Sequence, residues 1–89
     1  MRVNFRISGL VQGIGYRWFV RERAAKRSLT GLVRNHRDGS VEGEVQGEKE
    51  AVEAFLSEIR TDHPWARVSG AEAHATEERK GEKDFIIAH

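Results

Sequence analysis

A short glycine-rich segment just before an arginine is the part of the sequence best suited to chemistry. Three glycines fall within the seven residues from Gly9 to Gly15, and Arg17 follows two positions later. A helix is predicted to start at Tyr16, so the loop leads into a helix N-terminus, where unpaired amides and the helix dipole favour an anion. Arg17 would add a permanent charge and a planar fork of donors for two phosphate oxygens. The pattern indicates a phosphate or carboxylate site, and the alternative is an ordinary glycine-rich turn with a solvated arginine.

The spacing in this loop does not fit two familiar nucleotide-binding motifs. Trp18 stands where a dinucleotide fingerprint that begins at Gly13 would have its third glycine. No Gly-Lys-Ser/Thr sequence follows the loop, as a nucleotide P-loop would require. We therefore expect neither motif and no cofactor.

The chain has no cysteine. This excludes a disulfide framework, a thiolate metal site and a thiol nucleophile. The histidines show no spacing typical of metal ligands, so no metal site is predicted and each is expected at the surface or at the terminus. They are His36, His63, His74 and His89.

A net charge of +1 conceals a strong asymmetry along the chain. Residues 1–40 carry nine Lys/Arg and two acidic residues, a balance of +7, whereas residues 41–89 carry six Lys/Arg and twelve Asp/Glu, a balance of −6. An anionic ligand would thus be met by the first half of the chain. The alternative is that the two halves fold together and neutralise each other.

Hydrophobic periodicity predicts the elements that must position these groups. Val3, Phe5 and Ile7 alternate with polar residues, which is typical of a strand with one buried face. A helix is predicted from residue 16 to about residue 27, with Trp18 partly exposed. Strands are predicted over residues 29–35 and 40–46, joined by a hairpin turn at Asp38-Gly39.

The second half of the chain continues this order. Apolar residues at i, i+3, i+4 and i+7 from Val52 to Ile59 predict an amphipathic helix, which Pro64 closes. Residues 66–75 are predicted to form a strand whose apolar face consists of small residues. Residues 76–84 are expected to be an exposed loop, and residues 85–87 a short last strand. Trp65 is expected to pack the preceding loop onto the sheet.

The resulting order, β-α-β-β-α-β with a small final strand, predicts an α+β fold. It matches the ferredoxin-like sandwich, in which two helices pack on one face of an antiparallel sheet, here with a short extra C-terminal edge strand. A chain of 89 residues has room for one core, so residues 1–89 are expected to form a single domain.

No apolar run approaches the roughly 18 residues of a membrane helix. The N-terminal residues also lack the apolar stretch of a signal peptide. The predicted location is therefore cytoplasmic, with no membrane partner.

Two segments resemble the signatures of the acylphosphatase family. Residues 9–17, Gly-Leu-Val-Gln-Gly-Ile-Gly-Tyr-Arg, are similar to the first signature. Residues 31–35, Gly-Leu-Val-Arg-Asn, followed by Asp-Gly-Ser-Val-Glu at 38–42, resemble the second. The resemblance covers essentially the whole chain. It implies the ferredoxin-like fold and metal-independent hydrolysis of small acyl phosphates to a carboxylate and inorganic phosphate.

The resemblance also implies roles for individual residues. Arg17 would bind the phosphate, and Asn35 would orient the attacking water. The cradle for the phosphate would comprise Val11, Gln12, Gly13, Ile14, Gly15 and Tyr16. The chain departs from the family pattern at Leu32, where an aromatic residue is common, and at Arg27 and Ser28. Ser28 replaces a frequent glycine after the first helix, where a left-handed cap would favour glycine.

The chemistry of an acyl phosphate suits such a site. Its carboxylate leaving group is a weak base that departs without a general acid, and a loose phosphoryl transition state asks little of the nucleophile. Positioning and charge stabilisation by an arginine, backbone amides and an amide side chain should then suffice. Asn35 is suited to holding a water molecule but not to taking its proton.

Two other functions fit the predicted fold. RNA-binding domains of this fold use exposed aromatic residues on the sheet, but the outward positions of the first and third strands here carry none, so no nucleic-acid partner is expected. A second alternative is an acylphosphatase-like domain that handles carbamoyl phosphate within a larger maturation protein. A chain ending at His89 favours a free-standing enzyme, and a monomer is expected.

Overall fold

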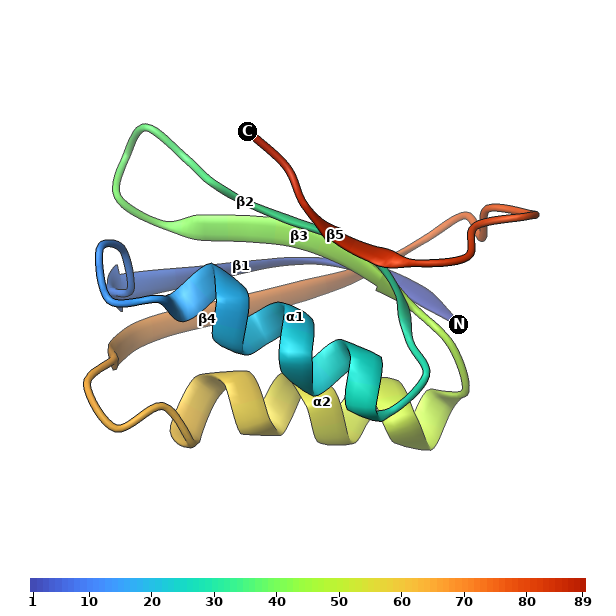
Figure 1. Cartoon of the computed structure of the whole chain (residues 1–89), viewed down its shortest axis with the longest axis horizontal. Helices are drawn as coiled ribbons and strands as arrows, with labels where there is room; N and C mark the ends of the chain where they lie inside the picture. Colours follow the sequence, from blue (N-terminus) through green and yellow to red (C-terminus); the bar gives the residue numbers. More distant parts are fainter.

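The computed structural model describes residues 1–89 and confirms the predicted α+β element order (Figure 1). Two helices lie on one face of a five-stranded sheet, the ferredoxin-like arrangement. Neither helix combines the length and the apolar character needed to cross a membrane. The elements are β1 (Arg2–Leu10), α1 (Tyr16–Lys26), β2 (Thr30–Asn35), β3 (Val41–Gln46), α2 (Lys49–Thr61), β4 (Arg67–Thr76) and β5 (Phe85–Ile87).

The strands are arranged in the order β4-β1-β3-β2-β5. The first four pair antiparallel, as predicted, but β5 runs parallel to β2, with Ile87 opposite Val33. The sheet is therefore mixed rather than wholly antiparallel. The cause is the segment of residues 77–84, which carries the chain from the end of β4 to the start of β2, where the Gly31 amide donates to the Asp84 carbonyl at 3.0 Å.

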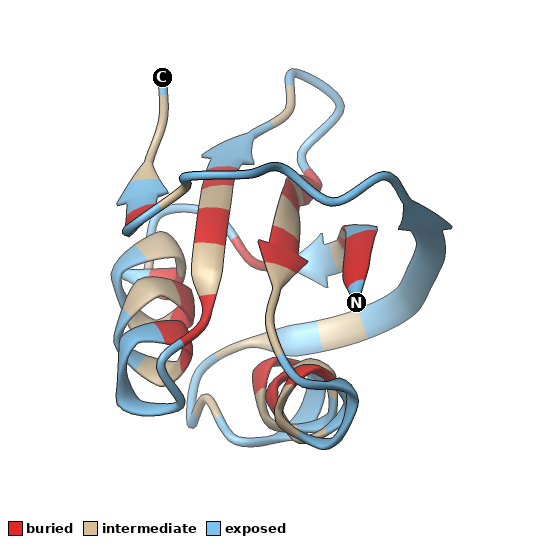
Figure 2. Cartoon of the chain, turned by 90° about the vertical axis from the view of Figure 1, so that its right-hand side faces the viewer, coloured by how far each residue is buried: buried red, intermediate tan, exposed pale blue.

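The core fills the space between the sheet and the two helices. Figure 2 shows buried residues at intervals along the strands and on the sides of the helices that face the sheet. The rings of Phe5 on β1 and Phe55 on α2 meet edge to face, with centroids 5.7 Å apart. Alternation in the strands and helical periodicity in α2 thus converge on one apolar layer, as the sequence predicted.

The predicted apolar face of β4 is not buried. Ala71, Ala73 and Ala75 are exposed, and Val68 is only half-buried. Methyl side chains are too short to fill the space up to α2, and a shallow groove of about 280 Å³ remains between the two elements. The apolar pattern correctly indicated a strand, but it did not indicate burial.

Trp65 does not pack onto the sheet, because 73% of it is exposed. His63 takes the structural role instead. Its ring lies edge-on to Phe19 at 5.0 Å, and its Nδ1 accepts hydrogen bonds from the amides of Trp65 and Ala66. This half-buried histidine therefore shapes the turn that follows α2, which the expectation of a surface position missed.

A buried ion pair closes the far end of the sheet. The guanidinium of Arg2 is fully buried and donates to Glu44 at 2.7 Å, to Gln46 at 3.0 Å and to Glu82 at 2.8 Å. Residues 77–84 form an exposed loop, as predicted, except that Glu82 is half-buried against Arg2. Since an unpaired buried charge is costly, these partners are what allow Arg2 to stand inside the protein.

The end of α1 indicates that serine at position 28, where the family often has glycine, lowers the stability of the protein. Ser28 has φ 58°, the left-handed conformation that the sequence position predicts. The amide of Ser28 donates to Ala25 and that of Leu29 to Ala24, and Leu29 and Ala24 are both buried. This is a complete Schellman motif, in which glycine is the favoured residue at the left-handed position.

We expect Ser28→Gly to stabilise the protein by about 1 kcal/mol, because glycine adopts the left-handed conformation without steric cost. Urea denaturation followed by circular dichroism measures the free energy of unfolding. Ser57→Gly is the matched control, since Ser57 is an exposed residue inside α2, and there glycine should destabilise by about 0.5 kcal/mol or more. A destabilised Ser28→Gly variant would contradict the assignment.

Glu82 should make stability depend on pH. The hydrogen bond from Arg2 lowers the pKa of Glu82 below its ordinary value of 4.5. A carboxylate with a lowered pKa stabilises the folded state above its ordinary pKa, and the contribution disappears as the pH falls through the folded value. We expect Glu82→Gln to cost about 2 kcal/mol at pH 7 and much less at pH 3, by urea denaturation at both values.

Glu78→Gln provides the comparison for this ion pair. Glu78 pairs with the N-terminal amine at 3.1 Å, but its side chain is 63% exposed. Screening by solvent should keep the cost of Glu78→Gln below about 0.5 kcal/mol. Equal losses in the two variants, or a loss in Glu82→Gln that persists at pH 3, would refute the role given to Arg2 and Glu82.

Candidate active site

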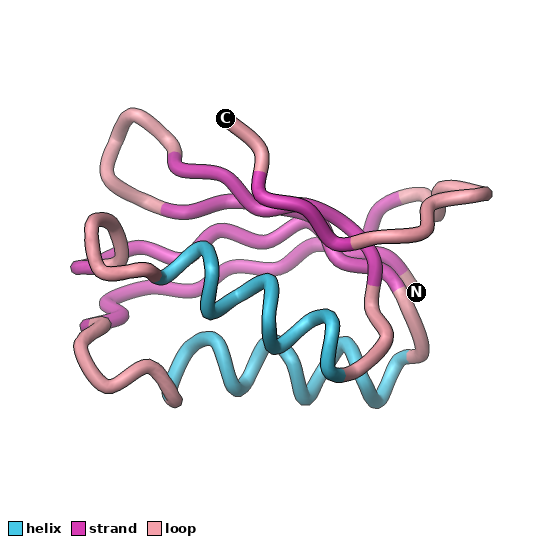
Figure 3. The backbone as a smooth tube through the Cα atoms, viewed as in Figure 1, coloured by secondary structure: helices cyan, strands magenta, loops and turns pink.

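The sheet brings the glycine-rich loop and Asn35 to the same end of the molecule. Both β1 and β2 pair antiparallel with β3, so they run in the same direction, and Val41 of β3 lies opposite both Ile7 of β1 and Asn35 of β2. The loop of residues 11–15 leaves the same end of β1 at which Asn35 closes β2. Figure 3 shows this loop beside the hairpin between β2 and β3.

The loop owes its shape to backbone conformations that glycine adopts readily. Gly13 has φ 76°, and Gly15, the residue that caps α1, has φ 73° and ψ 20°. An added Cβ at either position would meet nothing within 4 Å. The requirement for glycine is therefore conformational rather than one of space.

The loop and the first turn of α1 present a set of free backbone donors. None of the N–H groups of residues 12–18 donates a hydrogen bond within the protein. The first helical bond runs from Phe19 to the carbonyl of Gly15. Unpaired amides at a helix N-terminus are suited to binding an anion such as phosphate.

Arg17 is the charged group beside these amides. Its side chain is half-buried, and no carboxylate lies within salt-bridge distance of it. The other arginines of α1 are paired: Arg21 contacts Glu22, and Arg23 contacts Glu58 and Asp62. Arg17 thus keeps its donor fork available for a ligand.

A pocket of about 190 Å³ brings these groups together. Of the residues predicted for the site, Ile14 alone is not part of its lining; it is half-buried and packs against the core. Trp18 and Ile87 also line the pocket, although the sequence analysis did not include them in the site. The lining consists of Val11, Gln12, Gly13, Gly15, Tyr16, Arg17, Trp18, Asn35 and Ile87.

The two additional residues carried different amounts of sequence signal. Trp18 adjoins Arg17 and does not fit the apolar stripe of α1, so its position was a usable hint. Ile87 was placed in a short strand, but its approach to the pocket depends on the parallel pairing of β5 with β2, which the sequence did not reveal.

Gln12 connects the loop to the hairpin that carries Asn35. Its side-chain amide donates to the carbonyls of His36 and Ser40, both at 2.9 Å. The turn itself is held by Asp38, which accepts hydrogen bonds from the Ser40 amide and hydroxyl; these bonds lower the pKa of Asp38 to about 2. Gln12 therefore fixes the distance between the two halves of the pocket.

Tyr16 anchors the start of α1 below the pocket. Its ring is fully buried, its hydroxyl donates to the Ile59 carbonyl of α2, and burial raises the pKa of the phenol. The side chain cannot reach a ligand in this arrangement, so a contribution of Tyr16 to phosphate binding would come from its backbone amide.

Two further findings bear on the choice of site. No group of three acidic or histidine side chains is arranged to hold a metal ion. A larger hollow of about 360 Å³ lies on the open face of the sheet, but its arginines, Arg6 and Arg34, both pair with Glu42. Free donors converge at the smaller pocket, which makes it the better candidate.

Comparison with known proteins identifies the family of this chain. The sequence profile of the acylphosphatase family matches residues 3–87. An acylphosphatase of Geobacillus thermodenitrificans is 43% identical over 88 residues, which cover 99% of this chain and 94% of the relative. The crystal structure of an acylphosphatase from Bacillus subtilis has a TM-score of 0.93 at 31% identity and covers 99% of this chain and 98% of its own.

A domain of a larger protein is also similar. The crystal structure of full-length HypF in its phosphate- and nucleotide-bound form has a TM-score of 0.85 at 32% identity; the match covers 99% of this chain but 12% of HypF. The chain matches the acylphosphatases of Geobacillus thermodenitrificans and Bacillus subtilis over nearly their whole length. It therefore belongs to the acylphosphatase family.

Proposed function

We propose that this enzyme hydrolyses small acyl phosphates to a carboxylate and inorganic phosphate without a metal ion. The observation that carries the proposal is the shared pocket of Arg17, Asn35 and the free amides of residues 12–18. Such a set of donors matches the charge and the oxygen-rich surface of a phosphoryl group. The family relationship supports the same substrate class.

The proposed reaction needs each of these groups for a separate task. The backbone amides and Arg17 bind the phosphoryl oxygens and stabilise the charge spread over them in the transition state. Asn35 accepts a hydrogen bond from a water molecule and orients its oxygen toward phosphorus. The new bond joins the water oxygen to phosphorus while the bond between phosphorus and the acyl oxygen breaks. The carboxylate leaves unprotonated, and both protons of the water end on the product, dihydrogen phosphate.

No acid or base is required for this reaction. The departing carboxylate is a weak base and is stable without protonation, and the nucleophile takes little charge in a loose transition state. Since the demand is for position and positive charge, backbone amides, one guanidinium and one carboxamide suffice. This reasoning also underlies the proposal that metal ions are dispensable.

The first test is hydrolysis of benzoyl phosphate with a chelator present. We expect activity in the wild type and a loss of more than about a hundredfold in turnover for both Arg17→Ala and Asn35→Ala. Arg17→Ala should also lose inhibition by inorganic phosphate, whereas Asn35→Ala should largely keep it. That separation distinguishes a phosphate-binding residue from a water-orienting one.

Matched controls come from the same elements. Arg21→Ala removes a positive charge one turn further along α1, and Asn4→Ala removes an exposed amide from β1; neither residue lines the pocket. Both variants should remain close to wild type. A folded wild type without activity above buffer, or full activity in the two site variants, would overturn the proposal.

The second test concerns Gln12, for which we propose a positioning role. Gln12→Ala removes both hydrogen bonds to the hairpin, and Gln12→Glu replaces the donor by an acceptor that cannot bond to a carbonyl. Misplacement of Asn35 relative to the loop should lower turnover about ten- to a hundredfold. Steady-state kinetics measures this loss, and turnover unchanged in both variants would refute the role.

The proposal also covers the domain organisation, the oligomeric state and the location of the protein. We propose that residues 1–89 act as a single-domain monomer in the cytoplasm. One apolar cluster, which includes residues of both helices and of the strands β1, β2, β3 and β5, supports the single domain. Sedimentation of the active protein tests the monomer, since a concentration-independent mass near 10.1 kDa is expected.

A further inference from the structure

We infer that Trp18 and Ile87 form an apolar wall that binds the acyl group of the substrate, so that the site favours acyl phosphates with an aromatic or large apolar acyl group over acetyl phosphate. The inference rests on the proposed function, because it assigns the wall to the non-phosphate part of the same substrate. It concerns the side chains of two residues that line the pocket. The phosphoryl group is assigned to Arg17 and to backbone amides, and the amide of Trp18 is kept when its side chain is replaced.

The position of Trp18 is not explained by the core. The residues of α1 that are fully buried are Tyr16, Val20 and Ala24, which define the inward face of the helix. Trp18 lies two positions after Tyr16, on another side of the helix, and 57% of it is exposed. More than half of the side chain therefore stays in water in the folded protein, although it lines the pocket and follows Arg17 in the sequence.

Ile87 reaches the pocket from a different element. It lies on β5, opposite Val33 of β2, and the amide of Ala88 donates to the Val33 carbonyl at 2.8 Å. Asn35 is two residues beyond Val33 on the same strand. Ile87 is half-buried and packs against the core, so its position is fixed by the sheet while part of it faces the pocket.

The division of polar and apolar groups matches an acyl phosphate. The free amides, Arg17 and Asn35 provide donors and an oriented water for the phosphoryl end, while Trp18 and Ile87 provide apolar surface beside them. Trp18 is exposed, so an acyl group that reaches it removes apolar area of both partners from water. An acetyl group offers a single methyl to such a surface, whereas a phenyl ring can stack on the indole.

Such a wall acts on ground state and transition state alike, because the acyl group is present in both. Its loss should therefore raise KM for an aromatic substrate and leave kcat nearly unchanged. The size expected for one aromatic contact at an open site is about three- to tenfold. Inorganic phosphate has no acyl group, and acetyl phosphate has a methyl group too small to stack on the indole, so the binding of both should be unchanged.

Trp65 offers a matched control in the same chain. It is 73% exposed, more than Trp18, and its ring contacts His63 without lining the pocket. Trp65→Ala therefore removes an exposed indole of the same size elsewhere on the surface. Since both residues are exposed, neither substitution should prevent folding, and Trp18→Phe keeps an aromatic ring in place.

The binding test uses two unreactive phosphonates and isothermal titration calorimetry. We expect benzylphosphonate to bind wild type about three- to tenfold more tightly than methylphosphonate. Trp18→Ala should abolish that difference by weakening benzylphosphonate alone, whereas Trp18→Phe and Trp65→Ala should keep it. Equal affinities in the wild type, or a preference that survives in Trp18→Ala, would overturn the inference.

The kinetic test separates this inference from the proposed function. In Trp18→Ala, KM for benzoyl phosphate should rise about three- to tenfold while kcat, KM for acetyl phosphate and inhibition by phosphate stay unchanged. An equal loss with both substrates would refute the wall while leaving the hydrolase intact. A wild type that hydrolyses neither substrate but keeps the phosphonate preference would refute the hydrolysis and uphold the apolar wall.

Discussion

The antiparallel pairing of β3 with both β1 and β2 is the constraint on which the site depends. Val41 lies opposite Ile7 on one side and Asn35 on the other, so the ends of two strands that are not neighbours are held in one line. The loop of residues 11–15 and the β2–β3 hairpin then meet without any contact between β1 and β2. Gln12 adds the local connection, with two hydrogen bonds across the remaining gap. The strand pairing brings the loop and the hairpin together, and the side chain of Gln12 sets the distance between them.

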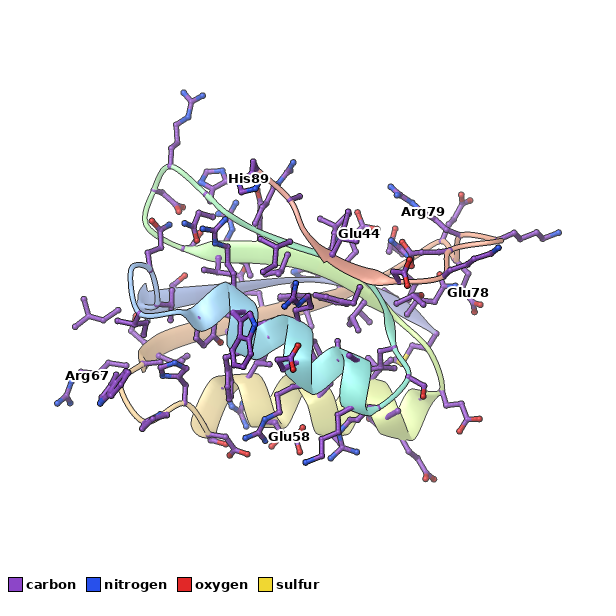
Figure 4. All side chains as sticks on the ribbon, viewed as in Figure 1. Glu44, Glu58, Arg67, Glu78, Arg79 and His89 are labelled. Carbon is purple, nitrogen blue, oxygen red and sulfur yellow. The ribbon has the colours of Figure 1, made fainter.

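Most of the excess positive charge in the first half of the chain is neutralised by ion pairs in the folded protein. Basic residues of the first half pair with acidic residues of the second: Arg2 with Glu82, Arg34 with Glu42, and Arg27 with Glu58. Figure 4 shows Glu58 on α2. Both Arg23 and Arg27, at the end of α1, form ion pairs with Glu58. Lys26 and Arg37 are also unpaired, but both are exposed, whereas Arg17 is half-buried and lines the pocket without a carboxylate partner. The two explanations of the charge asymmetry are therefore compatible: the two halves of the chain neutralise each other, and one arginine of the first half is left for an anion.

Features determined by neighbouring residues could be predicted from the sequence, whereas features determined by contacts between distant segments could not. The apolar period of α2, the hairpin at Asp38-Gly39 and the left-handed Ser28 follow from neighbouring residues, and all were predictable. The parallel direction of β5 and the burial of Arg2 depend on how residues 77–84 cross the end of the sheet, which no local pattern encodes. In the pocket, the loop and Arg17 could be predicted because they are neighbours in the sequence. Ile87 was missed because its place depends on the pairing of β5 with β2.

Because the candidate site consists largely of backbone amides, most of its side chains have no role in the proposed reaction. Gly13 and Gly15 must keep their conformations, but the space around them is open, and Tyr16 contributes its ring to the core rather than to the pocket. In the proposed function, the phosphoryl group would be bound by Arg17 and by backbone amides that any sequence with this loop would share. If so, discrimination among acyl phosphates would come from the few side chains at the rim. Trp18 is the largest of these and is not committed to the core, so the rim can change its preference without disturbing the groups that hold the phosphate.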